Sequence, residues 1–146
     1  MADIERTASA VWQGDLRKGN GQISSTSGVI QNTPYTYATR FENEPGTNPE
    51  ELIAAAHAAC FSMAFANTLA KQGYQPERIE ARATCIMVAK PEGGHKIARM
   101  RLVVRGRVPG IDEATFRRVA QEADQGCPVS NLLRCGLEIQ HDVSLM

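Results

Sequence analysis

The feature that most constrains this chain is a long stretch without any charged side chain. From Leu52 to Ala70 the sequence contains no Asp, Glu, Lys or Arg. Asn48 and Pro49 before the stretch suit the N-cap and first position of a helix, and Gly73 after it suits a helix end. We therefore predict one helix of about 24 residues, roughly 36 Å long at 1.5 Å per residue.

A helix that is apolar on every side is expected to be buried on every side. A domain of this size rarely surrounds a helix alone, so we expect a second copy of the chain to cover part of it in a homodimer. A membrane span is the alternative interpretation. The Ala-rich composition, with His57, Ser62 and Asn67 inside the stretch, argues against it.

Length and charge place limits on the class of protein. The chain has 146 residues, which suits one domain over residues 1–146. Sixteen Lys and Arg balance sixteen Asp and Glu, so the formal net charge is zero. That balance argues against nucleic-acid binding and against attraction to an anionic membrane. The first six residues lack a secretion-signal pattern, so we expect the chain in the cytoplasm, where thiols stay reduced.

The rest of the chain alternates strand patterns with helix patterns, which predicts an α+β fold. Residues 8–41 have the pattern of a β-meander, whose third strand would place Arg40 on the side opposite an aromatic face. The later expected elements are two hairpin strands, a helix capped by Asp112, a short helix and a final strand, over residues 79–89, 96–108, 112–126, 127–134 and 137–145.

Four cysteines are the candidate reactive groups. They form no CxxC pair, and the histidines do not join them in a zinc-binding pattern. Cys60 lies mid-helix, where it fits a small core residue and gains little from the helix dipole. Cys127 stands at the N-cap of the short helix, where the pKa of a thiol tends to fall, so local electrostatics alone favour Cys127 as the nucleophile. Cys85 and Cys135 are expected to have packing roles.

Three charged or polar residues are also candidates, each with a simpler interpretation. Arg40 by itself fits a solvated residue, and Glu50 fits a helix-start acid that matches the helix dipole. His57 lies one turn before Cys60 and fits a buried, hydrogen-bonded histidine better than a general base.

Two motifs resemble those of a known family. Residues 46–64, GTNPEELIAAAHAACFSMA, are similar to the signature of the OsmC/Ohr family, the osmotically inducible and organic-hydroperoxide-resistance proteins. Residues 126–130, GCPVS, resemble the second motif of that family. The His-Ala-Ala-Cys sequence that ends at Cys60 is closer to the OsmC branch than to the Ohr branch.

The resemblance implies an activity and a set of roles. It implies an intertwined homodimer that reduces organic hydroperoxides, with Cys60 as the peroxidatic cysteine and Cys127 as the resolving cysteine that closes a disulfide. Glu50 matches the acidic residue of the site, and Arg40 is our match for its arginine. An external dithiol of the lipoyl or thioredoxin type would reduce the disulfide, and no metal, haem or flavin is required.

The alternatives from other classes are a non-catalytic stress-response binding protein and a redox sensor on the same scaffold. The apolar helix around Cys60 favours alkyl or fatty hydroperoxides as substrates. Glu50 and Cys60 are separated by about 15 Å along one helix, so, unless the helix is broken between them, we expect the two residues of one site to come from different subunits.

Overall fold

The computed structural model describes residues 2–136 and 138–143. The chain forms two compact units, Met1–Ile53 and Ala54–Met146, and the boundary between them falls inside the long helix. The elements are strands and helices in the mixed order of an α+β fold, as predicted. The single-domain organisation stays a prediction.

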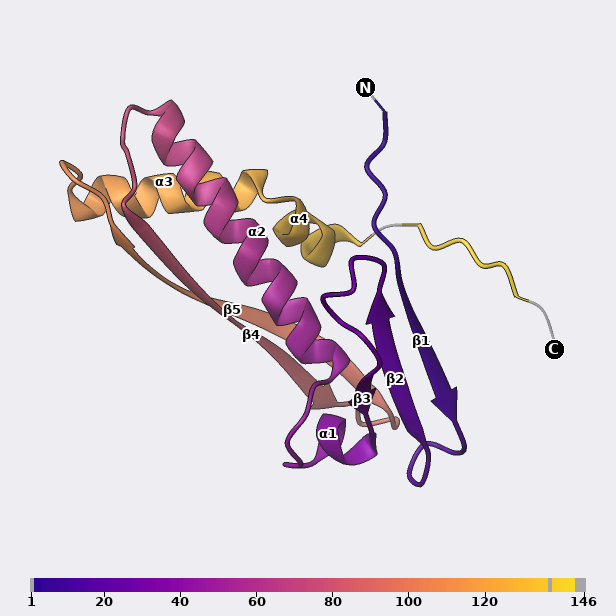
Figure 1. Ribbon diagram of the computed structural model, residues 1–146. Coiled ribbons are helices and arrows are strands. Elements are labelled where there is room, and N and C mark those ends of the chain that lie inside the picture. Colours follow the sequence, from indigo (N-terminus) through magenta and orange to yellow (C-terminus); the bar gives the residue numbers. More distant parts are fainter. Residues whose placement is uncertain (1, 137, 144–146) are drawn as a thin grey trace. The chain divides into compact units, whose positions relative to one another are not determined.

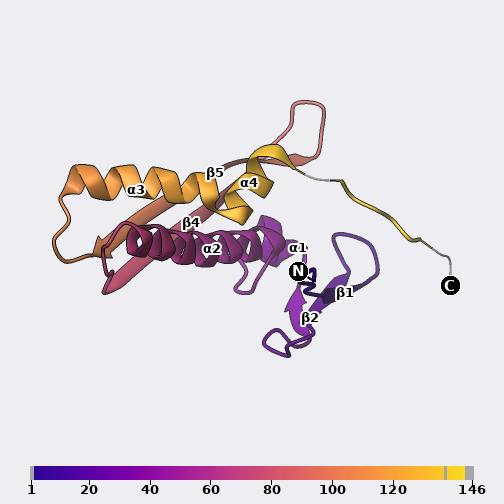
Figure 2. The same cartoon turned by 90° about the horizontal axis from the view of Figure 1, so that it is seen from above.

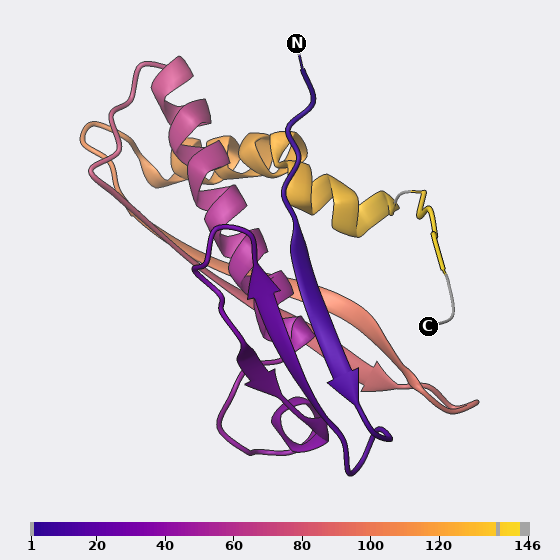
Figure 3. The same cartoon turned by 45° about the vertical axis from the view of Figure 1, so that its right-hand side comes forward.

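A three-stranded antiparallel sheet makes up most of the first unit. Its strands are β1 (Ala8–Gln13), β2 (Asn20–Ser25) and β3 (Thr33–Tyr35), in the order β1-β2-β3. Figure 3 shows the three strands as a meander, with each strand next to the one that follows it in the chain. Gly14 begins the first turn with a φ of 90°, a conformation that glycine adopts without the strain of a side chain. The predicted β-meander is confirmed for the first two strands and for the beginning of the third.

The predicted third strand is too long, because its second half is helical. β3 ends at Tyr35 and is followed by the short helix α1 (Tyr37–Phe41). Thr36 caps α1 by accepting a hydrogen bond from the Thr39 backbone N–H, and the Thr39 hydroxyl accepts one from the Thr36 N–H. This capping box satisfies donors at the helix start and overrides the alternating pattern. Arg40 therefore lies on a helix rather than on a strand.

The long helix α2 (Pro49–Lys71) is close to its predicted bounds. The Asn48 side chain accepts a hydrogen bond from the Glu51 backbone N–H at 2.8 Å, which is the predicted N-cap. Gly73 ends the helix with a φ of 89°, and its N–H bonds the Ala70 carbonyl at 3.1 Å. By length and composition α2 could cross a membrane, a test that core helices of soluble proteins also pass.

The second unit contains a long hairpin and three helical segments. Strands β4 (Arg78–Ala89) and β5 (His95–Arg107) pair antiparallel, as the sequence predicts. Helix α3 (Glu113–Gly126) begins after the Asp112 cap, and the chain bends at Cys127 into helix α4 (Pro128–Cys135). Figure 1 shows α2, α3 and α4 beside this hairpin.

The core of this unit lies where α2 and α3 meet over the hairpin. Figure 1 and Figure 2 together show α2 next to α3 and crossing it at an angle. Phe65 packs against Phe61 and Phe116, with ring centroids 5.7 and 5.0 Å apart. The buried hydrophobic residues are Phe61, Phe65, Leu69, Val119, Ala123 and Cys127. The core thus includes Cys127. The chain bends at this residue, between α3 and α4.

The predicted final strand is wrong over the described residues. Residues 138–143 form no strand, while residues 137 and 144–146 lie outside the described part of the chain. Alternating side chains do not make a strand by themselves, because the backbone groups also need a neighbouring strand to pair with. Among the described residues the strands pair only as β1-β2-β3 and β4-β5.

Candidate active site

Two cysteines from distant parts of the chain meet in the second unit. Cys60 lies on α2 and Cys127 at the start of α4, and their sulfur atoms are 3.4 Å apart. Both are free thiols, Cys60 half-buried and Cys127 fully buried. A disulfide bond is about 2.05 Å long, so a small movement of the side chains would join the two sulfurs.

The surroundings of the two thiols differ. Burial raises the pKa of Cys60 above its ordinary value, although a backbone hydrogen bond from Val129 acts against this. Burial also acts to raise the pKa of Cys127, but its contacts with Ser130 and with the Cys60 thiol outweigh this effect, so this pKa is lowered. Within this unit Cys127 is therefore the thiol that ionises more readily, as its helix-start position predicts. A thiolate at Cys60 would need a cation beside it, because burial favours the neutral thiol.

A second pair of predicted residues meets in the first unit. Arg40 Nη2 lies 2.7 Å from Glu50 Oε1, and Arg40 Nε lies 3.2 Å from both carboxylate oxygens of Glu50. The carboxylate is buried in the first turn of α2, and the guanidinium is partly exposed. Such a charge-assisted fork holds the guanidinium in one orientation, with donors left over for another group.

The arginine–glutamate pair belongs to the first unit and the thiol pair to the second. α2 runs unbroken from Pro49 to Lys71, so Glu50 and Cys60 are ten residues apart on one axis. At 1.5 Å per residue the separation is about 15 Å, which is more than the reach of the two side chains. The structure thus brings Cys60 to Cys127, and Arg40 to Glu50.

A histidine and a serine lie beside the thiols and form a buried polar contact. His57 Nε2 is 2.8 Å from Ser130 Oγ, and both side chains are buried. The buried histidine was predicted, but its partner was not. Ser130 is 73 positions further along the chain, and only its place in the second motif, three residues after Cys127, could have drawn attention to it.

The other two cysteines lie away from this contact. Cys85 is half-buried on β4, opposite Met100 of β5. Cys135 is exposed at the end of α4, so the packing role predicted for it is wrong. No group of three or more His, Cys, Asp or Glu that could hold a metal ion is found among the described residues.

Comparison with known proteins assigns this chain to a family. A family model described as OsmC-like protein matches residues 41–142. Peroxiredoxin OsmC of Escherichia coli (strain K12) is 43% identical over 140 residues, which cover 96% of this chain and 97% of that protein. Organic hydroperoxide resistance protein OhrB of Bacillus subtilis (strain 168) is 28% identical over 120 residues, with 82% and 86% covered.

Solved structures agree with the fold. The crystal structure of OhrB of Bacillus subtilis matches with a TM-score of 0.65 at 25% identity, over 88% of this chain and 91% of that one. An organic hydroperoxide resistance protein from Elizabethkingia anophelis matches with a TM-score of 0.68 over 94% of both chains, and its 24% identity supports the fold alone. This chain therefore belongs to the family of OsmC-like proteins, as its two motifs predict.

Proposed function

We propose that this chain is a cysteine-based peroxidase that reduces organic hydroperoxides to alcohols. The names of its relatives, peroxiredoxin OsmC and organic hydroperoxide resistance protein, support a peroxide-related function. The observation that carries the proposal is the distance of 3.4 Å between the sulfurs of Cys60 and Cys127, two free thiols that come from the two family motifs.

In the first step the Cys60 thiolate attacks the terminal oxygen of the hydroperoxide. An S–O bond forms, the O–O bond breaks, and the alkoxide leaves and takes up a proton to become the alcohol. Cys60 is oxidised to a sulfenic acid. Cys60 suits this role because it is half-buried and so more accessible than Cys127, which lies inside the core.

In the second step Cys127 attacks the sulfenic sulfur and water is released. The product is a disulfide between Cys60 and Cys127, which an external dithiol reduces by thiol–disulfide exchange. A lipoyl-type or thioredoxin-type dithiol has the required chemistry, because each can supply two electrons and two protons and become a disulfide itself.

The Arg40–Glu50 pair is the proposed source of positive charge for Cys60. Burial holds the pKa of Cys60 up, so the thiolate needs a cation beside it. The guanidinium of Arg40 would stabilise the thiolate and donate a hydrogen bond to the leaving oxygen, while Glu50 orients it. Because α2 separates Glu50 from the Cys60 of the same chain, the pair would act on the thiol of a second subunit.

The exposed surface of α2 supports the homodimer that this arrangement requires. In the single chain only 22% of the most apolar stretch of α2 is buried. The side chain of Met63, within this helix, is 73% exposed. An apolar surface of this extent is unfavourable in water and is typical of an interface. A second copy of the chain would cover it and bring the two half-sites together.

The central test is a steady-state peroxidase assay. Cumene hydroperoxide and hydrogen peroxide are supplied in turn, each with dihydrolipoamide and with thioredoxin, and loss of peroxide is followed. We expect many turnovers per chain and faster reaction with cumene hydroperoxide. Consumption that stops after one equivalent per chain would identify a redox sensor, and no consumption would identify a binding protein.

A further inference from the structure

A buried polar chain connects Cys127 to a pocket on the side of α2 that faces β5. Cys127 is 0% exposed, Ser130 3% and His57 4%. Ser130 lies about one turn of α4 after Cys127, close enough for its hydroxyl to act on the pKa of the thiol, and its Oγ is 2.8 Å from His57 Nε2. A serine hydroxyl rotates, so it can accept a proton from the thiol while it donates its own to the imidazole. A thiol this deeply buried cannot exchange its proton with water directly, so it needs neighbouring groups that can carry the proton.

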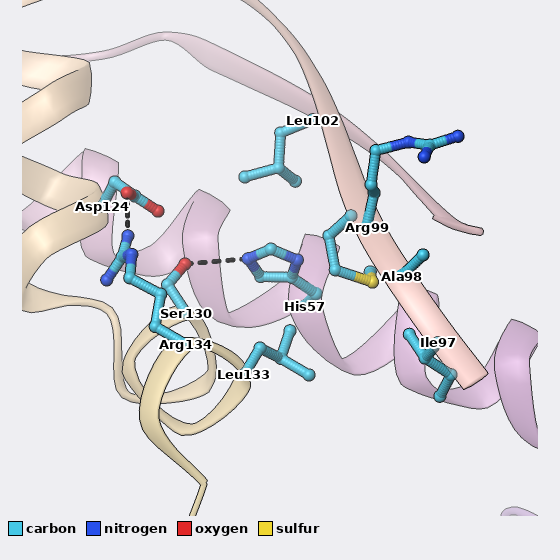
Figure 4. A pocket seen from close by; sticks show the side chains of 10 residues that line it. His57, Ile97, Ala98, Arg99, Leu102, Asp124, Ser130, Leu133 and Arg134 are labelled. Carbon is cyan, nitrogen blue, oxygen red and sulfur yellow. Dashed lines mark hydrogen bonds and ion pairs between the residues drawn. The ribbon is translucent and has the colours of Figure 1, made fainter. Parts of the chain in front are cut away.

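The chain ends at a nitrogen that lacks a partner. His57 Nδ1 is buried and makes no hydrogen bond to the described residues. His57 lines a pocket of about 450 Å³ together with Ile97, Ala98 and Leu133. Figure 4 shows the imidazole between Ser130 on one side and β5 on the other. A buried polar atom without a partner is costly, and a pocket of this size has room for water molecules to supply one.

We propose that Ser130 and His57 form a proton relay, which takes the proton of Cys127 during disulfide formation and passes it to the pocket. The proposal rests on the proposed function, since it concerns the step that closes the Cys60–Cys127 disulfide. Ser130 touches the reacting sulfur, whereas His57 acts through Ser130.

The proton movements balance the resolving step. As Cys127 attacks the sulfenic sulfur of Cys60, the S–S bond forms, the S–O bond breaks, and its electron pair leaves on hydroxide. The Cys127 proton moves to Ser130 Oγ, the Ser130 proton moves to His57 Nε2, and Nδ1 releases its proton to water in the pocket. Hydroxide and the released proton make one water, so a sulfenic acid and a thiol become a disulfide and water.

The same relay runs in reverse during reduction. A dithiol attacks the disulfide at Cys60, which is the less buried sulfur, and Cys127 leaves as a thiolate. A proton then enters from the pocket at His57 Nδ1 and reaches Cys127 through Ser130. This restores the starting tautomer of His57, so the relay is ready for the next cycle.

The charges around His57 keep it able to accept a proton. Burial lowers the pKa of His57 below 6.5, Asp124 acts to raise it, and Arg134 acts to lower it further. Asp124 and Arg134 pair with each other beside the pocket, and Figure 4 shows the guanidinium of Arg99 pointing away from the ring. On α2 itself the neighbouring titratable group is Cys60. The lowered pKa favours the neutral imidazole, which can accept a proton.

The test separates oxidation of Cys60 from closure of the disulfide. One equivalent of cumene hydroperoxide is added, the reaction is quenched, and sulfenic acid and disulfide are counted by mass spectrometry. His57→Gln keeps a hydrogen-bonding side chain but cannot accept and release a proton, and Ser130→Ala removes the middle group. Because general acid–base groups contribute about 10²–10⁴-fold, we expect closure to slow at least about tenfold at pH 7, with oxidation of Cys60 changed less than about twofold.

Three readouts distinguish a relay from a structural role. The deficit of His57→Gln should shrink as the pH rises towards about 9, because a growing share of Cys127 is then already a thiolate and needs no proton acceptor. In His57→Ala, added imidazole should restore closure by occupying the vacated space. The double variant His57→Gln/Ser130→Ala should be no slower than Ser130→Ala, because the two residues act as a unit. His95→Gln is the matched control and should behave like the unmodified chain.

The relay through Ser130 and His57 can be tested whether or not the chain is a peroxidase. A deficit that is the same at every pH and is not relieved by imidazole would overturn the relay. If the chain fails to reduce hydroperoxides, diamide still converts the two thiols to a disulfide without a sulfenic acid. Slower diamide-driven closure in His57→Gln would then support the relay by itself, and unchanged closure would overturn it.

Discussion

The two thiols of the site differ at the residue scale in a way that assigns different tasks to them. Cys127 is buried and held by hydrogen bonds that lower its pKa, whereas burial raises the pKa of Cys60. A resolving cysteine needs to react only with a neighbouring sulfur, so burial does not hinder it. A peroxidatic cysteine needs access to substrate, and its thiolate can be stabilised by a cation from outside the unit.

Replacing each thiol separately tests these tasks. We expect Cys60→Ser to abolish turnover and Cys127→Ser to allow a single oxidation of Cys60, because the sulfenic acid then has no resolving partner. Trapping of the sulfenic acid and mass spectrometry locate the oxidised residue. Label found on Cys127 in the Cys60→Ser variant would show that the two roles are reversed.

The remaining cysteines should be dispensable for turnover. Cys85 lies on β4 and Cys135 is exposed at the end of α4, and neither is in the pair of sulfurs that meet. We expect Cys85→Ala and Cys135→Ala to keep turnover within about twofold of the unmodified chain. A large loss of rate with an unchanged circular dichroism spectrum would mean that a third thiol takes part.

At the scale of elements, helix α3 carries the bend that positions Cys127, and its start depends on one carboxylate. Asp112 accepts hydrogen bonds from the Thr115 backbone N–H at 2.8 Å and from the Thr115 hydroxyl at 3.1 Å. The backbone bond from Thr115 is the main cause that lowers the pKa of Asp112 below its ordinary value of 3.8. The charged form is thus favoured by folding.

This cap makes the stability of α3 depend on pH. Because the folded-state pKa lies below the unfolded one, the contribution is complete above the unfolded value and is lost as the pH falls through the folded value. Asp112→Asn keeps an acceptor but has no charge to lose. We expect thermal melts between about pH 5 and pH 2 to fall more steeply for the unmodified chain than for the variant. Parallel curves would contradict a stabilising charge at this cap.

At the scale of the whole molecule, the apolar surface of α2 argues for an obligate homodimer. A helix without charge from Leu52 to Ala70 should not remain open to water, and most of it is uncovered in one chain. We expect light scattering to give about twice the mass of one chain at every practical dilution. A stable monomer in the micromolar range would remove the argument.

Mixed dimers test whether each site takes residues from both subunits. A heterodimer of Glu50→Ala and Cys60→Ser chains is prepared with two different tags. If Glu50 acts on the Cys60 of its partner, one site carries both defects and the other carries none, so about half of the activity survives. If each site uses one chain only, every site is damaged and activity falls close to zero.

The sequence by itself determined the elements whose start and end signals are local. Asn48 and Gly73 bound α2, and Asp112 starts α3, because caps act through hydrogen bonds between residues a few positions apart. The prediction of a strand around Arg40 was wrong for a related reason. The Thr36–Thr39 capping box, another set of local hydrogen bonds, favours a helix over the alternating pattern.

Only the tertiary structure decided which distant residues meet. Cys60 and Cys127 are 67 positions apart, and His57 and Ser130 are 73 apart, yet each pair is in contact. The family motifs named the two cysteines, but no periodicity or cap could place Ser130 between Cys127 and His57. That arrangement follows from how α2 and α3 pack over the hairpin and where the chain bends into α4, which is set by the shape of the shared core.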